Sequence, residues 1–277
     1  MVNFDNKEEL EKIVECDAVT DKLMLRISVP DPTAKCRLDL KFGAEPEKLA
    51  PELIRDAARR GINLRGICFH VGSSCRDASA YIKAVEYSRK FFDLAASLGM
   101  KMDILDIGGG FPGIEQHKPT FEEIASLLRP SLSAHFPSSS GVRLIGEPGR
   151  FFACPPFTLA ANVTSATETN AARLTAKQKE FMYYVNDGVY GSFNCIFFDH
   201  NRPISRPLFV SSPFLFFTPS FSLYLSLRPP FQEKKLLPRL SVGDWLFWED
   251  MGAYTTEGAS SFLGIAPPTR YYFVSQQ

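Results

Sequence analysis

The stretch Ile104-Leu-Asp-Ile-Gly-Gly-Gly-Phe-Pro-Gly113 is an apolar run that ends abruptly in three consecutive glycines. A short apolar run of this kind is typical of a buried strand, and the glycines after it leave backbone N–H groups uncovered by side chains. Uncovered N–H groups that line a turn can bind an anion, above all a phosphate. We therefore expect a phosphate-binding turn here. The structural alternative is a tight strand-to-helix turn in which glycine only supplies unusual dihedral angles.

A second unusual turn, Gly146-Glu-Pro-Gly-Arg150, follows about one βα unit later and places a carboxylate near a guanidinium. A carboxylate that faces a pyridine-type nitrogen keeps that nitrogen protonated, and the forked donors of Arg150 suit a phosphate. The alternative is a surface pair of Glu147 and Arg150. Together, the two turns indicate a phosphorylated cofactor whose ring needs an acidic partner.

The first half of the sequence alternates between two kinds of segment. Short apolar runs at 22–28, 66–72, 102–107 and 143–146 predict strands, and amphipathic runs at 46–61 and 77–99 predict helices. Thr120 can cap a further helix, with Glu122 and Glu123 in its first turn. Strands that alternate with helices form parallel βαβ units, so we predict an α/β fold.

The polar residues of this half follow the predicted strands. His70 and Ser73 end the second strand, the glycines end the third, and Glu147 and Arg150 end the fourth. The carboxyl ends of strands form the catalytic face of a (β/α) barrel, and a doubly wound sheet binds ligands at the same ends. Four units are too few to close a barrel, so we expect residues 1–153 to form part of a TIM-like (β/α)8 barrel. On its own, His70 fits a half-buried, hydrogen-bonded histidine better than a ring stacked on a cofactor.

After Cys154 the pattern changes. Runs at 157–163, 181–185, 192–198, 244–248 and 271–274 predict strands with turns between them and no helix. We therefore expect residues 154–277 to form a mostly antiparallel β-domain, a sandwich or a barrel. Within it, Asp199 could bind a substrate cation or belong to a solvated loop, and Tyr254 could donate to a phosphate or simply pack.

The bulk composition is that of a soluble globular protein: 45% of the 277 residues are hydrophobic and 22% are charged. With 31 basic and 31 acidic residues, the sequence argues against binding to nucleic acid or a membrane surface through bulk charge. The six cysteines are scattered without a C-x-x-C pair, which favours reduced thiols in a cytoplasmic protein and no metal site. The polar, acidic start shows no secretory signal.

The segment 207–230 departs from the rest because Phe, Ser, Leu and Pro dominate it and no charge occurs before Arg228. Its length would span a bilayer, but its prolines and serines make a poor membrane helix. The prolines would also interrupt a strand ladder. Since these residues have pyrimidine-rich codons, a third interpretation is that the segment is intron-derived.

Taken together, the motifs resemble those of the eukaryotic ornithine decarboxylase family, fold-type III enzymes that use pyridoxal 5′-phosphate (PLP). The matching segments occur in the family's order: FHVGS at 69–73, LDIGGGFPG at 105–113, EPGR at 147–150, YVNDGVYGSFNC at 184–195, and GDW and MGAYT within 243–255. This conjunction is more specific than the G-x-G-x-x-G pattern that 108–113 also matches. A dinucleotide-binding oxidoreductase is disfavoured because Pro112 removes an N–H where its helix would begin.

The resemblance implies a barrel plus a β-domain, assembled as a homodimer that removes CO₂ from ornithine to give putrescine. It implies that His70 stacks on the PLP ring, that Glu147 faces the pyridine nitrogen, and that Asp199 binds the distal amine of ornithine. The cofactor-binding residues that it implies are Arg26, His70, Ser73, Gly108, Gly109, Gly110, Glu147, Gly149, Arg150 and Tyr254; the phosphate would be held by Ser73, Gly110, Arg150 and Tyr254.

The sequence also departs from the family. The Schiff-base lysine of the family lies in a motif resembling F-Y-A-V-K, which does not occur here. The family's W-G-P-x-C-D-G-x-D segment, which reaches into the partner's active site, has no match, and 209–228 stands in its region. Phe198 replaces the tyrosine that usually precedes Asp199. We therefore expect an N-terminally truncated chain that is inactive alone. The alternative is an antizyme-inhibitor-like, non-catalytic homologue that binds antizyme, although such homologues tend to erode the cofactor motifs that are intact here.

Overall fold

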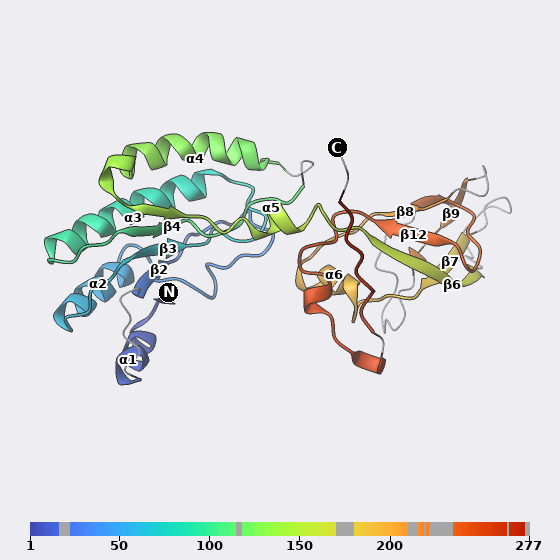
Figure 1. The fold of residues 1–277 in the computed structure, drawn as a ribbon, viewed down its shortest axis with the longest axis horizontal. Coiled ribbons are helices and arrows are strands. Elements are labelled where there is room, and N and C mark those ends of the chain that lie inside the picture. Colours follow the sequence, from blue (N-terminus) through green and yellow to red (C-terminus); the bar gives the residue numbers. More distant parts are fainter. Residues whose placement is uncertain are drawn as a thin grey trace. The chain divides into compact units, whose positions relative to one another are not determined.

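The computed structural model describes residues 1–16, 23–114, 118–169, 180–209, 215–218, 220–221, 235–264 and 266–274. The chain divides into two compact units, Met1–Phe152 and Ala153–Gln277. Figure 1 shows an α/β unit at the blue and green end of the sequence and a unit made mainly of strands at the yellow and red end. Each unit is described by itself.

The first unit is built on a parallel sheet of five strands in the order β1-β2-β3-β4-β5. Its elements are β1 (Val2–Phe4), α1 (Lys7–Glu15), β2 (Leu23–Ile27), α2 (Leu49–Arg59), β3 (Gly66–Phe69), α3 (Ser79–Ser97), β4 (Ile104–Asp106), α4 (Phe121–His135), β5 (Arg143–Ile145) and the short α5 (Gly149–Ala153). Each strand lies beside the one that precedes it in the chain. A doubly wound sheet reverses its strand order, whereas a barrel does not, so the sequential order confirms the predicted partial barrel.

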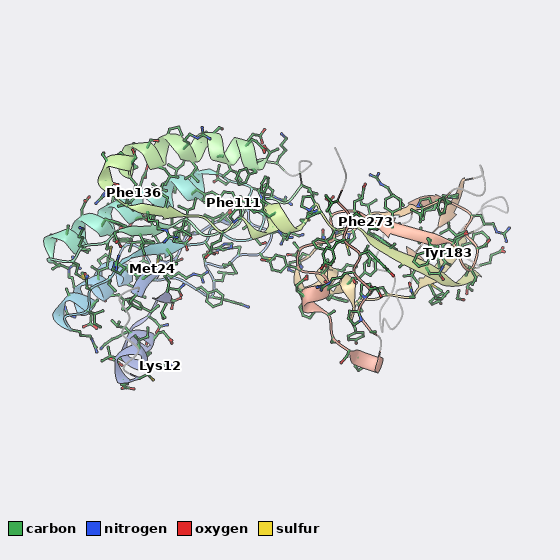
Figure 2. The ribbon with its side chains drawn as sticks, viewed as in Figure 1. Lys12, Met24, Phe111, Phe136, Tyr183 and Phe273 are labelled. Atoms are coloured by element: carbon green, nitrogen blue, oxygen red, sulfur yellow. The ribbon has the colours of Figure 1, made fainter. Side chains whose placement is uncertain are left out.

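The two faces of this sheet differ because successive side chains of a strand point to opposite sides. On one face, Leu25, Ile67 and Leu105 are fully buried among the apolar residues of the helices. On the other face, Met24, Cys68 and Ile104 form a separate small cluster with Ile145. Figure 2 labels Met24 on β2, and Phe136 beyond the last turn of α4. The second face, which corresponds to the inside of a barrel, is the one that leads into the polar strand ends.

The helix predicted after Thr120 is confirmed as α4. Thr120 Oγ1 accepts a hydrogen bond from the Glu123 N–H (3.2 Å), and Glu123 Oε2 accepts one from the Thr120 N–H (2.7 Å). This reciprocal pair satisfies two N–H groups that would otherwise lack helical partners. The unit formed by β1 and α1 was not predicted, although α1 has an Asn6 cap and buries Leu10 and Ile13. Its strand has three residues and its helix is mostly charged, so the segment contains few apolar residues.

The second unit contains a mostly antiparallel sheet in the order β10-β7-β6-β12-β8 and a separate β9–β11 pair, as predicted for a β-domain. One pairing, β10 with β7, is parallel. The elements are β6 (Leu159–Thr169), β7 (Glu180–Val185), α6 (Cys195–Phe198), β8 (Ser205–Pro207), β9 (Leu215–Thr218), β10 (Ser220–Phe221), β11 (Lys235–Pro238) and β12 (Trp245–Trp248).

Two of the predicted strands are wrong. Residues 192–198 form a 3-10 turn followed by α6, because Asp187 Oδ1 accepts hydrogen bonds from the N–H groups of Gly188 (2.6 Å) and Ser192 (2.9 Å) and curls the chain. Residues 271–274 consist of aromatic and β-branched residues but lie irregular and exposed, and Phe273 is 89% exposed. They pair with no strand among the residues that the structure describes.

Part of the atypical segment 207–230 does form strands. Leu215–Thr218 pairs antiparallel with β11, and Ser220–Phe221 pairs with β7. The rest of the segment, at 210–214, 219 and 222–230, lies outside the described residues. The prediction that the segment is intron-derived falls largely on these residues and stays a prediction. Within the described ranges, none of the helices is both long and apolar enough to cross a membrane.

Candidate functional site

The glycines after β4 lie against the end of β3. Gly108 has a φ of +61°, and a Cβ atom there would stand 2.0 Å from the carbonyl oxygen of Phe69. Gly110 has a φ of +105°, and its Cβ would stand 2.5 Å from the carbonyl oxygen of Gly72. Both the backbone conformation and the space therefore require glycine at these two positions. The ends of β3 and β4 approach each other as backbone against backbone.

Three hydrogen bonds fix this glycine turn. Asp106 Oδ1 accepts from the Gly108 N–H (2.9 Å), the Gly109 carbonyl accepts from the Tyr81 hydroxyl (3.0 Å), and the Gly110 carbonyl accepts from the Cys75 N–H (3.0 Å). Tyr81 is fully buried. The partners of the turn thus come from a strand (Asp106), a helix (Tyr81) and a loop (Cys75). This support would keep the turn in one conformation, as a preorganised anion-binding site requires.

His70 presents a neutral ring beside the turn. Its Nδ1 accepts a hydrogen bond from the Gly72 N–H (3.0 Å), which leaves the ring proton on Nε2. Burial, and then the positive charge of Arg26, lower the pKa of His70 to about 4. A Cβ at Gly109 would stand 2.9 Å from His70 Nε2, so the ring edge lies against the glycines. The site therefore contains a flat, uncharged aromatic surface at neutral pH.

Ser73 and Arg150 meet although 77 residues separate them in sequence. Arg150 Nη2 donates to Ser73 Oγ over 2.9 Å. The Ser73 carbonyl accepts from the Lys35 N–H (3.0 Å), and the Ser73 N–H donates to the Cys36 carbonyl (3.0 Å). The hydroxyl and the guanidinium predicted to hold a phosphate are thus adjacent, and a neighbouring loop fixes the serine.

Glu147 faces a second acid, Asp106. The Glu147 N–H donates to the carbonyl of Gly108 (2.8 Å). Partial burial, then the charge of Asp106 and hydrogen bonding with its carboxyl group, raise the pKa of Glu147 above the usual glutamate range, while Arg26 opposes the shift. Sequence reasoning missed Asp106. The signal for it was a charged residue directly after Leu105 in an apolar strand. Because neighbouring side chains of a strand point to opposite faces, Asp106 lies on the face away from the helices.

Arg26 on β2 lies on the same face, two strands away from Asp106. It is in register with Cys68, which is in turn in register with Asp106. Its guanidinium carbon lies 4.9 Å from the centroid of the Phe42 ring. Burial, and then the charge of Asp106, raise the pKa of Cys68 to about 12, so this thiol stays protonated between the charged groups.

Asp199 and Tyr254 belong to the second unit, whereas the other predicted site residues lie together in the first. Asp199 is 4% exposed and follows the last residue of α6, where its N–H donates to the Cys195 carbonyl (3.1 Å). Tyr254 is 57% exposed and has a φ of +57°, a conformation that non-glycine residues rarely adopt. Such outliers concentrate at functional sites.

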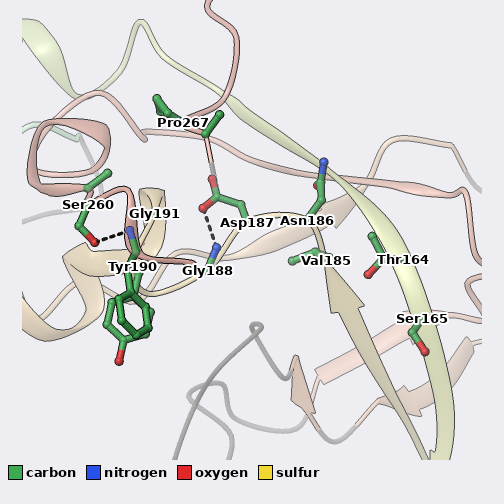
Figure 3. Close-up of a pocket in the computed structure, with 13 residues that line it drawn as sticks. Thr164, Ser165, Val185, Asn186, Asp187, Gly188, Tyr190, Gly191, Ser260 and Pro267 are labelled. Carbon is green, nitrogen blue, oxygen red and sulfur yellow. Dashed lines mark hydrogen bonds between the residues drawn. The ribbon is translucent and has the colours of Figure 1, made fainter. Parts of the chain in front are cut away.

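The second unit also contains a pocket of about 440 Å³ that the sequence did not predict. Figure 3 shows it at the turn after β7, with Asp187, Tyr190 and Ser260 on its walls. The Tyr190 and Phe262 rings lie 4.6 Å apart. Asp187 is the charged residue among the described residues that line the pocket, and its Oδ1 is already used by the turn.

The chain is similar to known proteins along nearly its whole length. Residues 1–154 match the family described as pyridoxal-dependent decarboxylase, pyridoxal binding domain. The chain is 47% identical over 283 residues to an ornithine decarboxylase of Caenorhabditis elegans, which covers all of this chain and 66% of the relative. It is 42% identical over 284 residues to antizyme inhibitor 2 of Xenopus laevis, covering 98% of this chain and 60% of the relative.

A solved structure of lysine/ornithine decarboxylase from Vibrio vulnificus, complexed with cadaverine, superposes with a TM-score of 0.80 at 29% identity. The match covers 96% of this chain and 67% of that one. The chain thus spans between 60% and 67% of the length of these three proteins.

Proposed function

Because the chain belongs to the family of pyridoxal-dependent decarboxylases, we propose that it is part of an ornithine decarboxylase that uses PLP to convert L-ornithine into putrescine and CO₂. The observation that carries this proposal is the convergence of the glycine turn, His70, Glu147 and the Ser73–Arg150 pair at the carboxyl ends of β3, β4 and β5. We further propose that the protein acts as a homodimer, as the family resemblance implies, and in the cytoplasm, which the six scattered cysteines favour.

The residues present fit PLP. The glycine turn carries no side chains that could cover its backbone N–H groups, and a hydroxyl and a guanidinium stand together beside it for a phosphate. The uncharged imidazole of His70 offers a flat surface for a ring. Glu147 supplies an acid whose proton affinity is raised, as a partner for a pyridine nitrogen.

When bound, PLP supplies an electron-accepting ring for the electron pair left on the α-carbon as CO₂ departs. In this proposal, Glu147 holds a proton at the pyridine nitrogen and so increases the electron demand of the ring. His70 covers one face of the ring and, being neutral, adds no competing charge. Ser73 and Arg150 fix the phosphate and thereby the position of the ring.

For the substrate, we propose that Asp199 binds the distal ammonium group of ornithine. A carboxylate that is 4% exposed pairs with a cation more strongly than a solvated one, because water screens it less. The lysine segment that the family resemblance implies has no match in this sequence. The 277-residue chain alone is therefore proposed to bind the cofactor without decarboxylating ornithine.

The cofactor proposal is tested by titrating PLP, and pyridoxal without the phosphate, into the 277-residue chain, with absorbance or fluorescence as the readout. We expect PLP to bind at least tenfold more tightly than pyridoxal, because charge-assisted hydrogen bonds from Arg150 contribute about 1.5–3 kcal/mol. R150M should abolish most of this preference, whereas R89M on α3 should retain it. Equal affinity of the wild-type chain for the two ligands would overturn the proposal.

The similarity to antizyme inhibitor 2 favours a second candidate function, in which the chain binds antizyme without catalysis. The two candidate functions differ in whether the chain needs to bind PLP. A chain that binds purified antizyme and shows no affinity for PLP would support the second candidate. A chain that binds PLP through Arg150 would support the decarboxylase.

A further inference from the structure

We propose that Asp106 is a positioning residue for Glu147, and that its buried carboxyl group holds the Glu147 carboxyl group toward the pyridine nitrogen and sustains the proton there. This inference rests on the proposed PLP-binding function. Asp106 lies within the LDIGGGFPG motif but is not among the residues that the family resemblance implies for cofactor binding. It acts through Glu147 and is therefore distinguished from a catalytic residue.

The strand register brings Asp106 and Glu147 together. Asp106 is the last residue of β4 and lies opposite Ile145, the last residue of β5. Because side chains alternate along a strand, Glu147 continues the face of Ile145, on which Asp106 also lies. Asp106 is 6% exposed, so its position is set by packing rather than by solvent.

Asp106 holds Glu147 through the backbone and through the side chain. Its Oδ1 accepts from the Gly108 N–H over 2.9 Å, and the Gly108 carbonyl accepts from the Glu147 N–H over 2.8 Å. The carboxyl group of Asp106 also acts on that of Glu147 directly, because its charge and hydrogen bonding raise the pKa of Glu147.

The charges around Glu147 make this arrangement sensitive to Asp106. The groups that act on Glu147 or flank it are Asp106 on β4, Arg26 on β2, Cys68 on β3 and His70 beyond it. Cys68 remains a thiol and His70 remains neutral, so neither adds charge here. The positive charge of Arg26 and the negative charge of Asp106 therefore act on Glu147 in opposite directions. Without the negative charge of Asp106, Arg26 would draw Glu147 toward its ionised form and weaken its hold on the proton.

D106N separates this role from a purely structural one. Asparagine keeps an amide oxygen that can accept from the Gly108 N–H, so the glycine turn retains its support. It removes the negative charge that faces Glu147. D103N is the matched control, because Asp103 lies just before the amino end of the same strand, where it pairs with the partly buried Arg65.

The experiment has one readout without cofactor and one with it. The 277-residue chain is labelled with ¹³C at the glutamate carboxyl carbon, the Glu147 resonance is assigned with E147Q, and its titration is followed in the wild type and both variants. PLP dissociation constants are measured in parallel. We expect D106N to lower the Glu147 midpoint and weaken PLP binding about tenfold, while D103N changes neither.

An unchanged Glu147 midpoint in D106N, or PLP affinity equal to that of D103N, would overturn the inference. If the wild-type chain fails to bind PLP, the proposed function is wrong, and the carboxyl titration still decides whether Asp106 controls the proton on Glu147. A lowered midpoint with weakened PLP binding in D106N alone supports the positioning role.

Discussion

The polar groups of the two units are held in different ways. In the first unit, Asp106, His70 and Glu147 follow regular parallel strands, and their positions are set by register. In the second unit, Asp187 organises an irregular turn by accepting two backbone N–H groups, and α6 and Asp199 follow from that turn. The first arrangement depends on backbone packing between strand ends, whereas the second depends on one side chain.

The comparison teaches where each unit should be vulnerable. A change that forces two strand ends apart should damage the first unit most, because its backbone has no room to move. A change that removes a single acceptor should damage the second unit, because backbone groups lose their partner there. The units can be followed separately, since the long helices lie in the first and both tryptophans, Trp245 and Trp248, lie in the second.

The largest effect is expected for G108A. The new Cβ would stand 2.0 Å from the Phe69 carbonyl oxygen, and alanine disfavours the φ of +61°. We expect a loss of about 4 kcal/mol of unfolding free energy, from overpacking and left-handed strain together. Urea unfolding followed by far-ultraviolet circular dichroism measures it in the first unit.

G141A is the matched control for this prediction. Gly141 also has a positive φ, +70°, but a Cβ there would meet no atom within 4 Å. Its cost should be about 1 kcal/mol, from conformation alone. Equal losses in the two variants would show that the close approach of the strand ends does not constrain the turn.

The next effect concerns the pH dependence of the first unit through His70. Its pKa of about 4 in the folded state lies below the unfolded value of about 6.5, so the unfolded chain binds the proton first as pH falls. The stability that His70 contributes is therefore complete above pH 6.5 and is lost progressively down to pH 4. The total loss approaches about 3 kcal/mol at 1.36 kcal/mol per pKa unit.

H70Q should remove this component, which is measured as the difference between the stability–pH curves of variant and wild type. H135Q, which removes a histidine from the last turn of α4, should retain it. A wild-type curve that runs parallel to that of H70Q between pH 6.5 and 4 would contradict the burial of a neutral His70.

Periodicity predicted most of the first unit and misplaced parts of the second. The strands β2 to β5 coincide with short apolar runs and the helices α2 and α3 with amphipathic ones, and the Thr120 cap marked the start of α4. The run 192–198 has strand-forming residues, yet a hydrogen bond from Ser192 to a residue five positions earlier decides its conformation. The strand propensity of the individual residues does not take that hydrogen bond into account.

The same distinction applies to the site. His70, Ser73, Glu147 and Arg150 could be predicted because each lies in a distinctive motif at a strand end. Asp106 stands out only as a charge in an apolar strand, and its pairing with Glu147 could not be predicted, because it depends on which residue of β5 lies opposite Asp106. Register is set by packing across the sheet, so the sequence of a single strand does not reveal it.

The smallest effect is expected for D187A in the second unit. Its loss leaves the N–H groups of Gly188 and Ser192 without their acceptor, and Ser192 is 1% exposed. Because an unsatisfied buried donor costs about 1–3 kcal/mol and the Gly188 N–H can turn to water, we expect a loss of about 2 kcal/mol. Tryptophan fluorescence during urea unfolding measures it. D187N keeps the acceptor and should cost less than half as much, whereas equal losses would mean that the turn depends on the charge of Asp187 rather than on its oxygen.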